Sequence, residues 1–210
     1  MLTMVLPALA VSDAPTADWD RAALHASMAG MYERSGYMEE AETEYLAALK
    51  SKPDLPILHA LLSAHYAARG FMDKAVAERR EHLRLSPDDR LSRFELCRLL
   101  QMSGQCAQAL PEIRKVVDSS PQSLPAVRLL GNCLYDLGRL DEAEAAYLKV
   151  LSMASDYAPA HSDLGLAYAR MGKEAEARRE FERALQLDPG LISAKQGLSF
   201  LKGRKAKPRR

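Results

Sequence analysis

The chain has 210 residues, of which 48% are hydrophobic and 27% are charged, and its 29 basic residues nearly balance 28 acidic ones. Alanine, leucine, glutamate and arginine are abundant, and because these residues favour helices the composition predicts a water-soluble helical protein. It excludes a transmembrane class, since no stretch approaches the roughly 20 consecutive apolar residues that cross a bilayer.

The first 21 residues differ in character from the rest of the chain. Residues 1–17, MLTMVLPALAVSDAPTA, begin with an apolar run but lack the Lys or Arg that precedes such a run in a secretory signal. We therefore interpret residues 1–21 as an N-terminal leader or cap of a cytoplasmic protein, with export through a weak signal peptide as the alternative. Cys97, Cys106 and Cys133 match neither a CxxC motif nor a zinc site, which favours reduced thiols in a reducing compartment.

After this segment the sequence repeats itself every 34 residues. Five windows follow one another without insertion: 22–55, 56–89, 90–123, 124–157 and 158–191. Position 15 of every window is glycine: Gly36, Gly70, Gly104, Gly138 and Gly172. Position 20 of every window is alanine: Ala41, Ala75, Ala109, Ala143 and Ala177. Because the chain has only 11 glycines, this alignment indicates a repeated structural unit.

The recurring positions predict a pair of helices in each window. A glycine after an apolar helix turns left-handed without steric cost, so position 15 ends a first helix and reverses the chain. The alanine at position 20 lies early in a second helix, where a methyl side chain lets two helices pack closely. Positions 7 and 11, such as Leu164 and Tyr168, share one face of the first helix and are predicted core. Proline at position 32 ends the second helix in four of the five windows: Pro53, Pro87, Pro121 and Pro189.

This pattern of leucine, a small residue and tyrosine, then alanine, an aromatic residue and proline, resembles the tetratricopeptide repeat. The resemblance implies an all-α, right-handed superhelical solenoid of helix-turn-helix repeats over residues 22–191. One hairpin cannot bury both of its faces, so neighbouring hairpins are expected to stack. The chain departs from the family where histidine stands at position 4 in place of the frequent tryptophan: His25, His59 and His161.

The end of the solenoid needs a cap. Residues 192–202, ISAKQGLSFLK, place Ile192, Leu198 and Leu201 at helical spacing and predict a C-terminal capping helix. Residues 203–210 are predicted to be a basic, disordered tail. Nucleic-acid binding is not expected, because the only basic run free of acidic residues is this tail, and it has no aromatic residues among its basic ones.

The sequence shows no catalytic signature. It contains no phosphate-binding glycine loop, HExxH, GxSxG or paired cysteines, so no catalytic, cofactor-binding or metal-binding residue is predicted. The histidines at position 4 are spaced by whole repeats and are not clustered at metal-ligand distance. We expect them to serve packing or to face solvent.

The family resemblance directs attention to the concave groove, which positions 2, 5, 9, 12 and 13 of each first helix line in such proteins. Aromatic residues, methionine and arginine dominate recognition surfaces, and arginine can hold a carboxylate through two bonds. The predicted partner-binding residues are Ile57, Leu91, Phe94, Arg98, Met102, Arg128, Asn132 and Tyr135. The alternative is that these are ordinary exposed residues of a solenoid.

The sequence therefore predicts a non-enzymatic protein–protein interaction module, an adaptor, scaffold or co-chaperone-like assembly factor, that binds a peptide or helical segment of a partner. One alternative is a self-associating structural or assembly subunit, with Arg79 and His82 of the second window in the contact between copies. Another is a regulatory subunit of an enzyme complex. The chaperone-peptide clamp of the family is not expected, because Asp163 stands where that clamp has asparagine.

Overall fold

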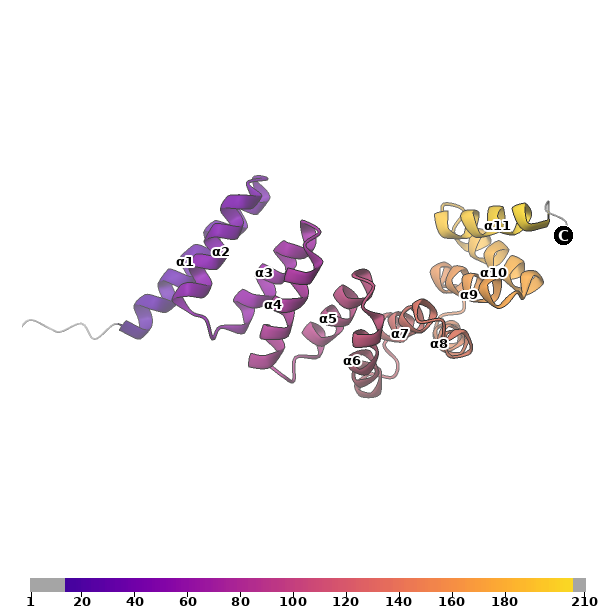
Figure 1. Cartoon of the computed structure of the whole chain (residues 1–210), viewed down its shortest axis with the longest axis horizontal. Coiled ribbons are helices and arrows are strands. Elements are labelled where there is room, and N and C mark those ends of the chain that lie inside the picture. Colours follow the sequence, from indigo (N-terminus) through magenta and orange to yellow (C-terminus); the bar gives the residue numbers. More distant parts are fainter. Residues whose placement is uncertain (1–13, 206–210) are drawn as a thin grey trace, which may run out of the picture. The chain divides into compact units, whose positions relative to one another are not determined.

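The computed structural model describes residues 14–205, and within this range it contains eleven α-helices and no strand (Figure 1). The chain divides into two compact units, Met1–Pro87 and Asp88–Arg210. The helices of unit 1 are α1 (Ala14–Arg34), α2 (Met38–Ser51), α3 (Pro56–Ala68) and α4 (Met72–Leu85). The helices of unit 2 are α5 (Arg90–Met102), α6 (Cys106–Ser119), α7 (Leu124–Asp136), α8 (Leu140–Met153), α9 (Ala158–Met171), α10 (Glu174–Leu187) and α11 (Ile192–Lys205). The predicted all-α fold of paired helices is confirmed.

The glycine at window position 15 makes each turn, as predicted. All five of these glycines have φ between 73° and 83°, a left-handed conformation that a side chain would strain. In the last pair, the Lys173 N–H donates to the Tyr168 carbonyl at 2.9 Å, and the Gly172 N–H donates to the Ala169 carbonyl at 3.2 Å. These bonds satisfy carbonyls that the end of α9 would otherwise leave without partners. Each first helix therefore ends abruptly and the second helix returns alongside it.

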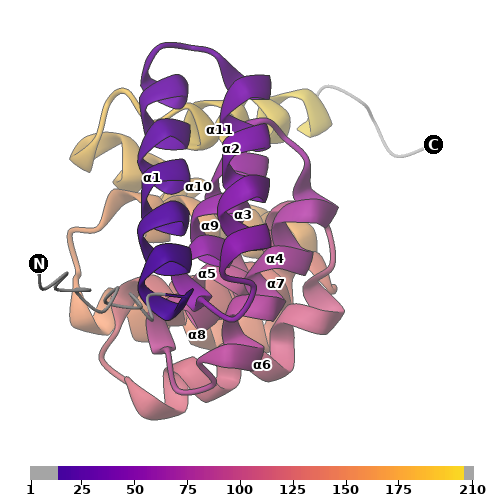
Figure 2. The same ribbon diagram turned by 90° about the vertical axis from the view of Figure 1, so that its left-hand side faces the viewer.

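In unit 1, α1 and α2 run side by side (Figures 1 and 2), and Ala22, Ala48 and Leu58 form a buried cluster between the first two pairs. Helix α1 begins at Ala14, so part of the segment that we assigned to a leader or cap is the first helix of the first pair. Residues 1–13, which include most of the possible signal peptide, lie outside the described residues.

In unit 2, aromatic side chains at window position 24 fill the core of the last pairs. Tyr147 packs with Leu134 and Leu164 between α7, α8 and α9, and Phe181 packs with Ala194 and Leu201 between α9, α10 and α11. Helix α11 continues to Lys205, three residues into the segment predicted to be disordered. The rest of the predicted tail, 206–210, lies outside the described residues.

Polar pairs tie the two helices of a repeat together. They join window position 4 on the first helix to position 23 on the second. The nitrogen–oxygen distances are 2.6 Å for His25–Glu44, 2.7 Å for His59–Glu78, 2.5 Å for Arg93–Glu112 and 2.7 Å for His161–Glu180. The side chains of His59 and His161 are only 13% and 12% exposed, so the expected packing role applies and the solvent-facing role does not.

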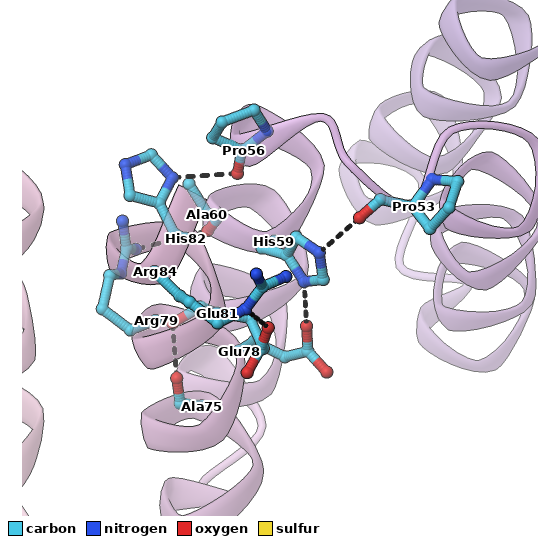
Figure 3. A network of polar contacts seen from close by, with 11 residues as sticks. Pro53, Pro56, His59, Ala60, Ala75, Glu78, Arg79, Glu81, His82 and Arg84 are labelled. Atoms are coloured by element: carbon cyan, nitrogen blue, oxygen red, sulfur yellow. Dashed lines mark hydrogen bonds and ion pairs between the residues drawn. The ribbon is translucent and has the colours of Figure 1, made fainter. Parts of the chain in front are cut away.

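His59 has a second bond that explains its position. Its Nδ1 faces Glu78, and its Nε2 lies 3.1 Å from the carbonyl oxygen of Pro53 in the loop before α3 (Figure 3). His161 repeats this arrangement with the carbonyl oxygen of Ser155 at 3.0 Å. Both ring nitrogens of each histidine therefore lie within hydrogen-bond distance of an oxygen atom. Each histidine thus links its own repeat to the loop that precedes that repeat.

Glu42 joins the two pairs of unit 1. It accepts a hydrogen bond from the Tyr66 hydroxyl at 3.0 Å, and its other oxygen lies 2.5 Å from the Arg69 guanidinium, with Lys74 also close. Burial alone would raise the pKa of Glu42, but the hydrogen bonds from Tyr66 and Lys74 and the nearby positive charges lower it below its ordinary value. The carboxylate form of Glu42 therefore stabilises the contact between α2 and α3.

This contact predicts that the stability of unit 1 depends on pH. A carboxyl whose pKa is lowered by folding contributes stability above its unfolded pKa and loses that contribution as the pH falls through the folded value. We expect Glu42→Gln to lower the free energy of unfolding of unit 1 by about 1–2 kcal/mol at pH 7, and this effect should shrink as the pH falls through the lowered pKa of Glu42. Urea unfolding followed by fluorescence of Trp19, the only tryptophan, measures unit 1.

The control is Glu40→Gln, because Glu40 lies on the same helix and is exposed. It is expected to change stability by less than about 0.5 kcal/mol at pH 7. An equal effect of the two substitutions at pH 7 would contradict the role given to Glu42.

Candidate functional site

The predicted partner-binding residues lie on three helices, α3, α5 and α7. Ile57 lies on α3 in unit 1, where it is 53% exposed, and the other seven lie on α5 and α7 in unit 2. Leu91 and Met102 on α5 are also exposed, at 72% and 51%. Arg98 on the same helix is exposed and donates to Glu95 at 2.9 Å and to the sulfur of Met102 at 3.2 Å. Phe94, which lies between Leu91 and Arg98 in the sequence, is half-buried.

Arg128 and Asn132 on α7 already have partners within unit 2. The Nε of Arg128 donates to the Asp163 carboxylate on α9 at 2.6 Å, and the Arg128 guanidinium lies over the Tyr157 ring. The Asn132 side-chain oxygen accepts a hydrogen bond from the Tyr147 hydroxyl at 3.0 Å. A carboxylate of a partner would therefore compete with Asp163 for the Arg128 guanidinium.

The Asp163 carboxyl is held in a low-polarity environment. Its side chain is only 14% exposed, and burial raises the pKa of Asp163 although the hydrogen bond and charge of Arg128 act in the opposite direction. The pair links α7 to α9, which are the first helices of neighbouring repeats. Its role is to hold the two repeats together.

Arg79 and His82 also bind within their own unit. Arg79 donates to the Ala60 carbonyl at 3.3 Å, and His82 Nδ1 lies 2.8 Å from the Pro56 carbonyl, both on α3 (Figure 3). The two residues are 9% and 6% exposed. This burial contradicts the hypothesis that they form a contact between two copies of the chain.

A cavity of about 520 Å³ opens on unit 2 where α7, α9 and α11 come together over α10. We name it the C-terminal cavity. Its lining residues are Tyr135, Leu166, Ala169, Arg170, Phe181, Ser193, Gln196, Gly197 and Phe200. Tyr135 is the single member of the predicted set that lines it. Leu166, Ala169 and Arg170 occupy the groove positions of the last window, which we had not favoured.

The residues of α11 were missed because this helix was treated only as a cap. Continuing the 34-residue numbering into α11 places Ser193, Gln196 and Phe200 at positions 2, 5 and 9, which are groove positions in every other window. That continued numbering was the signal in the sequence. Helix α11 therefore covers the last core and also supplies one wall of the cavity.

The floor of the C-terminal cavity is rigid and apolar. Phe181 is fully buried, and its ring lies directly against the backbone at Gly165 and Gly197, so neither glycine has room for a side chain. Phe200 on α11 is 58% exposed at the wall of the cavity. The surface offered here is suited to cover another apolar group.

The rim of the cavity carries a positive charge. The Arg170 guanidinium donates to the Tyr135 backbone carbonyl at 2.5 Å and lies 5.0 Å above the centre of the Tyr135 ring. These contacts fix the side chain, while Arg170 as a whole stays exposed. Arginine has five N–H donors, so a guanidinium held in this way still presents donors to a ligand.

Between residues 14 and 205 no group of three His, Cys, Asp or Glu side chains is placed to hold a metal ion, and no helix is long and apolar enough to cross a membrane. Burial raises the pKa of Cys97 to about 12 and that of Cys106 to about 11, which disfavours the reactive thiolate. The C-terminal cavity thus combines an apolar floor with one charged rim residue.

These features define a helical-repeat protein. Models of the tetratricopeptide repeat match residues 22–55 and 122–189, and a model of anaphase-promoting complex, cyclosome, subunit 3 matches residues 68–150. The chain is a tetratricopeptide repeat protein. No curated protein shows significant similarity to it.

Solved structures share the fold. MamA 41-end from Desulfovibrio magneticus RS-1 is 22% identical with a TM-score of 0.75, over 82% of this chain and 98% of that one. YrrB, described as a TPR protein with an unusual peptide-binding site, is 20% identical with a TM-score of 0.73, over 90% of this chain and 98% of that one. At these identities the likeness concerns the fold and does not transfer a binding site.

Proposed function

We propose that this chain is a non-enzymatic interaction module that binds a segment of a partner protein on unit 2 and takes a large apolar side chain of that segment into the C-terminal cavity. The observation that carries the proposal is the exposed Phe200 beside a preformed apolar cavity. A volume of about 520 Å³ lies within the range of ligand-binding pockets, roughly 300–1,000 Å³. The peptide-binding site named for YrrB, which has the same fold, supports a peptide ligand.

The rim indicates what the bound segment contains next to its apolar side chain. Arg170 is the charged residue of the lining, and its position over Tyr135 limits the freedom that it would lose on binding. A carboxylate of the ligand would gain charge-assisted hydrogen bonds from it. We therefore expect segments with leucine, methionine or phenylalanine close to aspartate or glutamate.

A display library of random linear peptides, selected against the intact chain, tests this function. Selected peptides are expected to share an apolar anchor beside an acidic residue and to bind Phe200→Ala at least about tenfold more weakly, the equivalent of 1.4 kcal/mol. Arg170→Ala is expected to weaken the binding of the acidic peptides to a similar degree.

Leu91→Ala is the matched control, since Leu91 is the more exposed residue and belongs to the set predicted from the sequence. It should leave the affinity unchanged. Peptides that lose affinity for Leu91→Ala and keep it for Phe200→Ala would place the site on α5 and would reject the cavity.

A further inference from the structure

The fourth repeat lacks the polar pair that the other four contain. At window positions 4 and 23 it has Val127 and Ala146, where the other repeats have histidine or arginine paired with glutamate. Both members of the pair are apolar, so no charge is left without a partner. Since alanine is much smaller than glutamate, the exchange leaves space beside α8.

The space is a second hollow in unit 2, of about 530 Å³, between α6 and α8 and over α7. We name it the α6–α8 hollow. Its floor includes Val127, Leu130, Leu134 and Ala146, and so it is apolar. Its residues differ entirely from those of the C-terminal cavity. The hollow is thus a separate feature that the proposed function does not use.

The walls of the hollow carry charges of both signs. Arg114 on α6 and Glu142 on α8 form an ion pair at 3.4 Å and close one end. Farther along the same helices, Asp118 on α6 and Lys149 on α8 line the hollow with exposed side chains. Because Arg114 and Glu142 pair with each other, the charge that remains at the hollow is acidic on the α6 side, at Asp118, and basic on the α8 side, at Lys149.

We propose that the α6–α8 hollow is a docking site for an amphipathic helix of a partner protein, which inserts one large apolar side chain and carries an acidic residue toward Lys149 and a basic residue toward Asp118. Two helices that form the walls of an apolar trough accept the side-chain ridge of a third helix. The opposite charges of the walls select a helix with charges of opposite sign on its two flanks, because a helix with like charges meets repulsion on one side.

Four stapled helical peptides test the site on the intact chain. Each carries one leucine at the centre of its apolar ridge, and its flanking residues are Glu and Lys, Lys and Glu, Glu and Glu, or Lys and Lys. Binding is followed by NMR of methyl-labelled alanine, valine and leucine. We expect shifts at Val127, Leu130 and Ala146 and an affinity for the mixed peptides about fivefold or more above that for either like-charged peptide.

Two variants test whether the peptides bind in the hollow itself. Val127→His with Ala146→Glu installs the pair that His161 and Glu180 form and should abolish binding of all four peptides, while thermal unfolding shows the fold intact. Asp118→Lys makes both walls basic without touching the core, so the preference should move to the peptide with two glutamates.

Equal affinity for all four peptides, or affinity that survives the installed pair, would overturn the proposal. A concentration-dependent dimer in sedimentation that the installed pair abolishes would also overturn it, because the occupant would then be a second copy. Phe200→Ala should not change the binding of these peptides, so failure of the α6–α8 hollow and failure of the C-terminal cavity are distinguishable.

Discussion

Replacing Gly197 with alanine is expected to destabilise unit 2 by about 2–4 kcal/mol, a large effect for the addition of one methyl group. A Cβ atom at Gly197 would lie 2.3 Å from the Phe181 ring, and one at Gly165 would lie 2.7 Å from it. The ring is fully buried between these two backbones, so a methyl group at Gly197 would have to push it out of its packed position toward the C-terminal cavity. Far-UV circular dichroism during urea unfolding, compared with Trp19 fluorescence from unit 1, measures the loss.

Gly203→Ala on the same helix is the matched control for this prediction. A Cβ atom there meets no atom within 4 Å, and alanine favours helices over glycine, so a gain of up to about 1 kcal/mol is expected. Phe181→Leu should recover part of the stability of Gly197→Ala by removing the clash. If Gly197→Ala and Gly203→Ala change stability in the same direction and by similar amounts, close packing of Phe181 against α11 is not the reason that residue 197 is glycine.

The fold was predictable because its determinants are local and recur. A glycine that needs a left-handed φ stands at the same place in each window, for example Gly138 and Gly172. Each hairpin has the same unburied faces, so stacking follows from one repeat. The beginning of α1 at Ala14 was not predictable in this way, since it lies before the first window and has no equivalent to compare with.

The candidate site was harder to predict because its availability depends on contacts between repeats. Arg128 has the residue type of a recognition site, yet Asp163, 35 residues later, occupies it. The repeat period places these two positions on neighbouring helices, but whether their side chains meet is decided by packing. Phe200 was missed for a different reason, because α11 was treated only as a cap and its exposed residues were not considered as groove positions.

Replacing Arg128 with leucine is the second substitution with a large expected effect. It leaves the Asp163 carboxylate, whose side chain is 14% exposed, without its positive partner, and breaking such a pair costs about 3–5 kcal/mol. Replacing both residues with leucine should recover most of this loss, because an apolar pair of similar volume needs no compensation for lost solvation. Urea unfolding of the single and double variants, followed by circular dichroism, measures the difference.

The pH dependence of the single variant identifies the cause of the loss. Burial raises the pKa of Asp163 in the folded state, and without Arg128 the folded state binds this proton more strongly still, while the unfolded state does not. Stability of Arg128→Leu should therefore fall as the pH rises from 4 to 7, relative to that of the double variant. A parallel pH dependence of the two variants would show that the Asp163 carboxylate is not the source of the loss. If Arg128 instead bound a partner protein, its replacement would weaken that binding and leave the urea-unfolding curve unchanged.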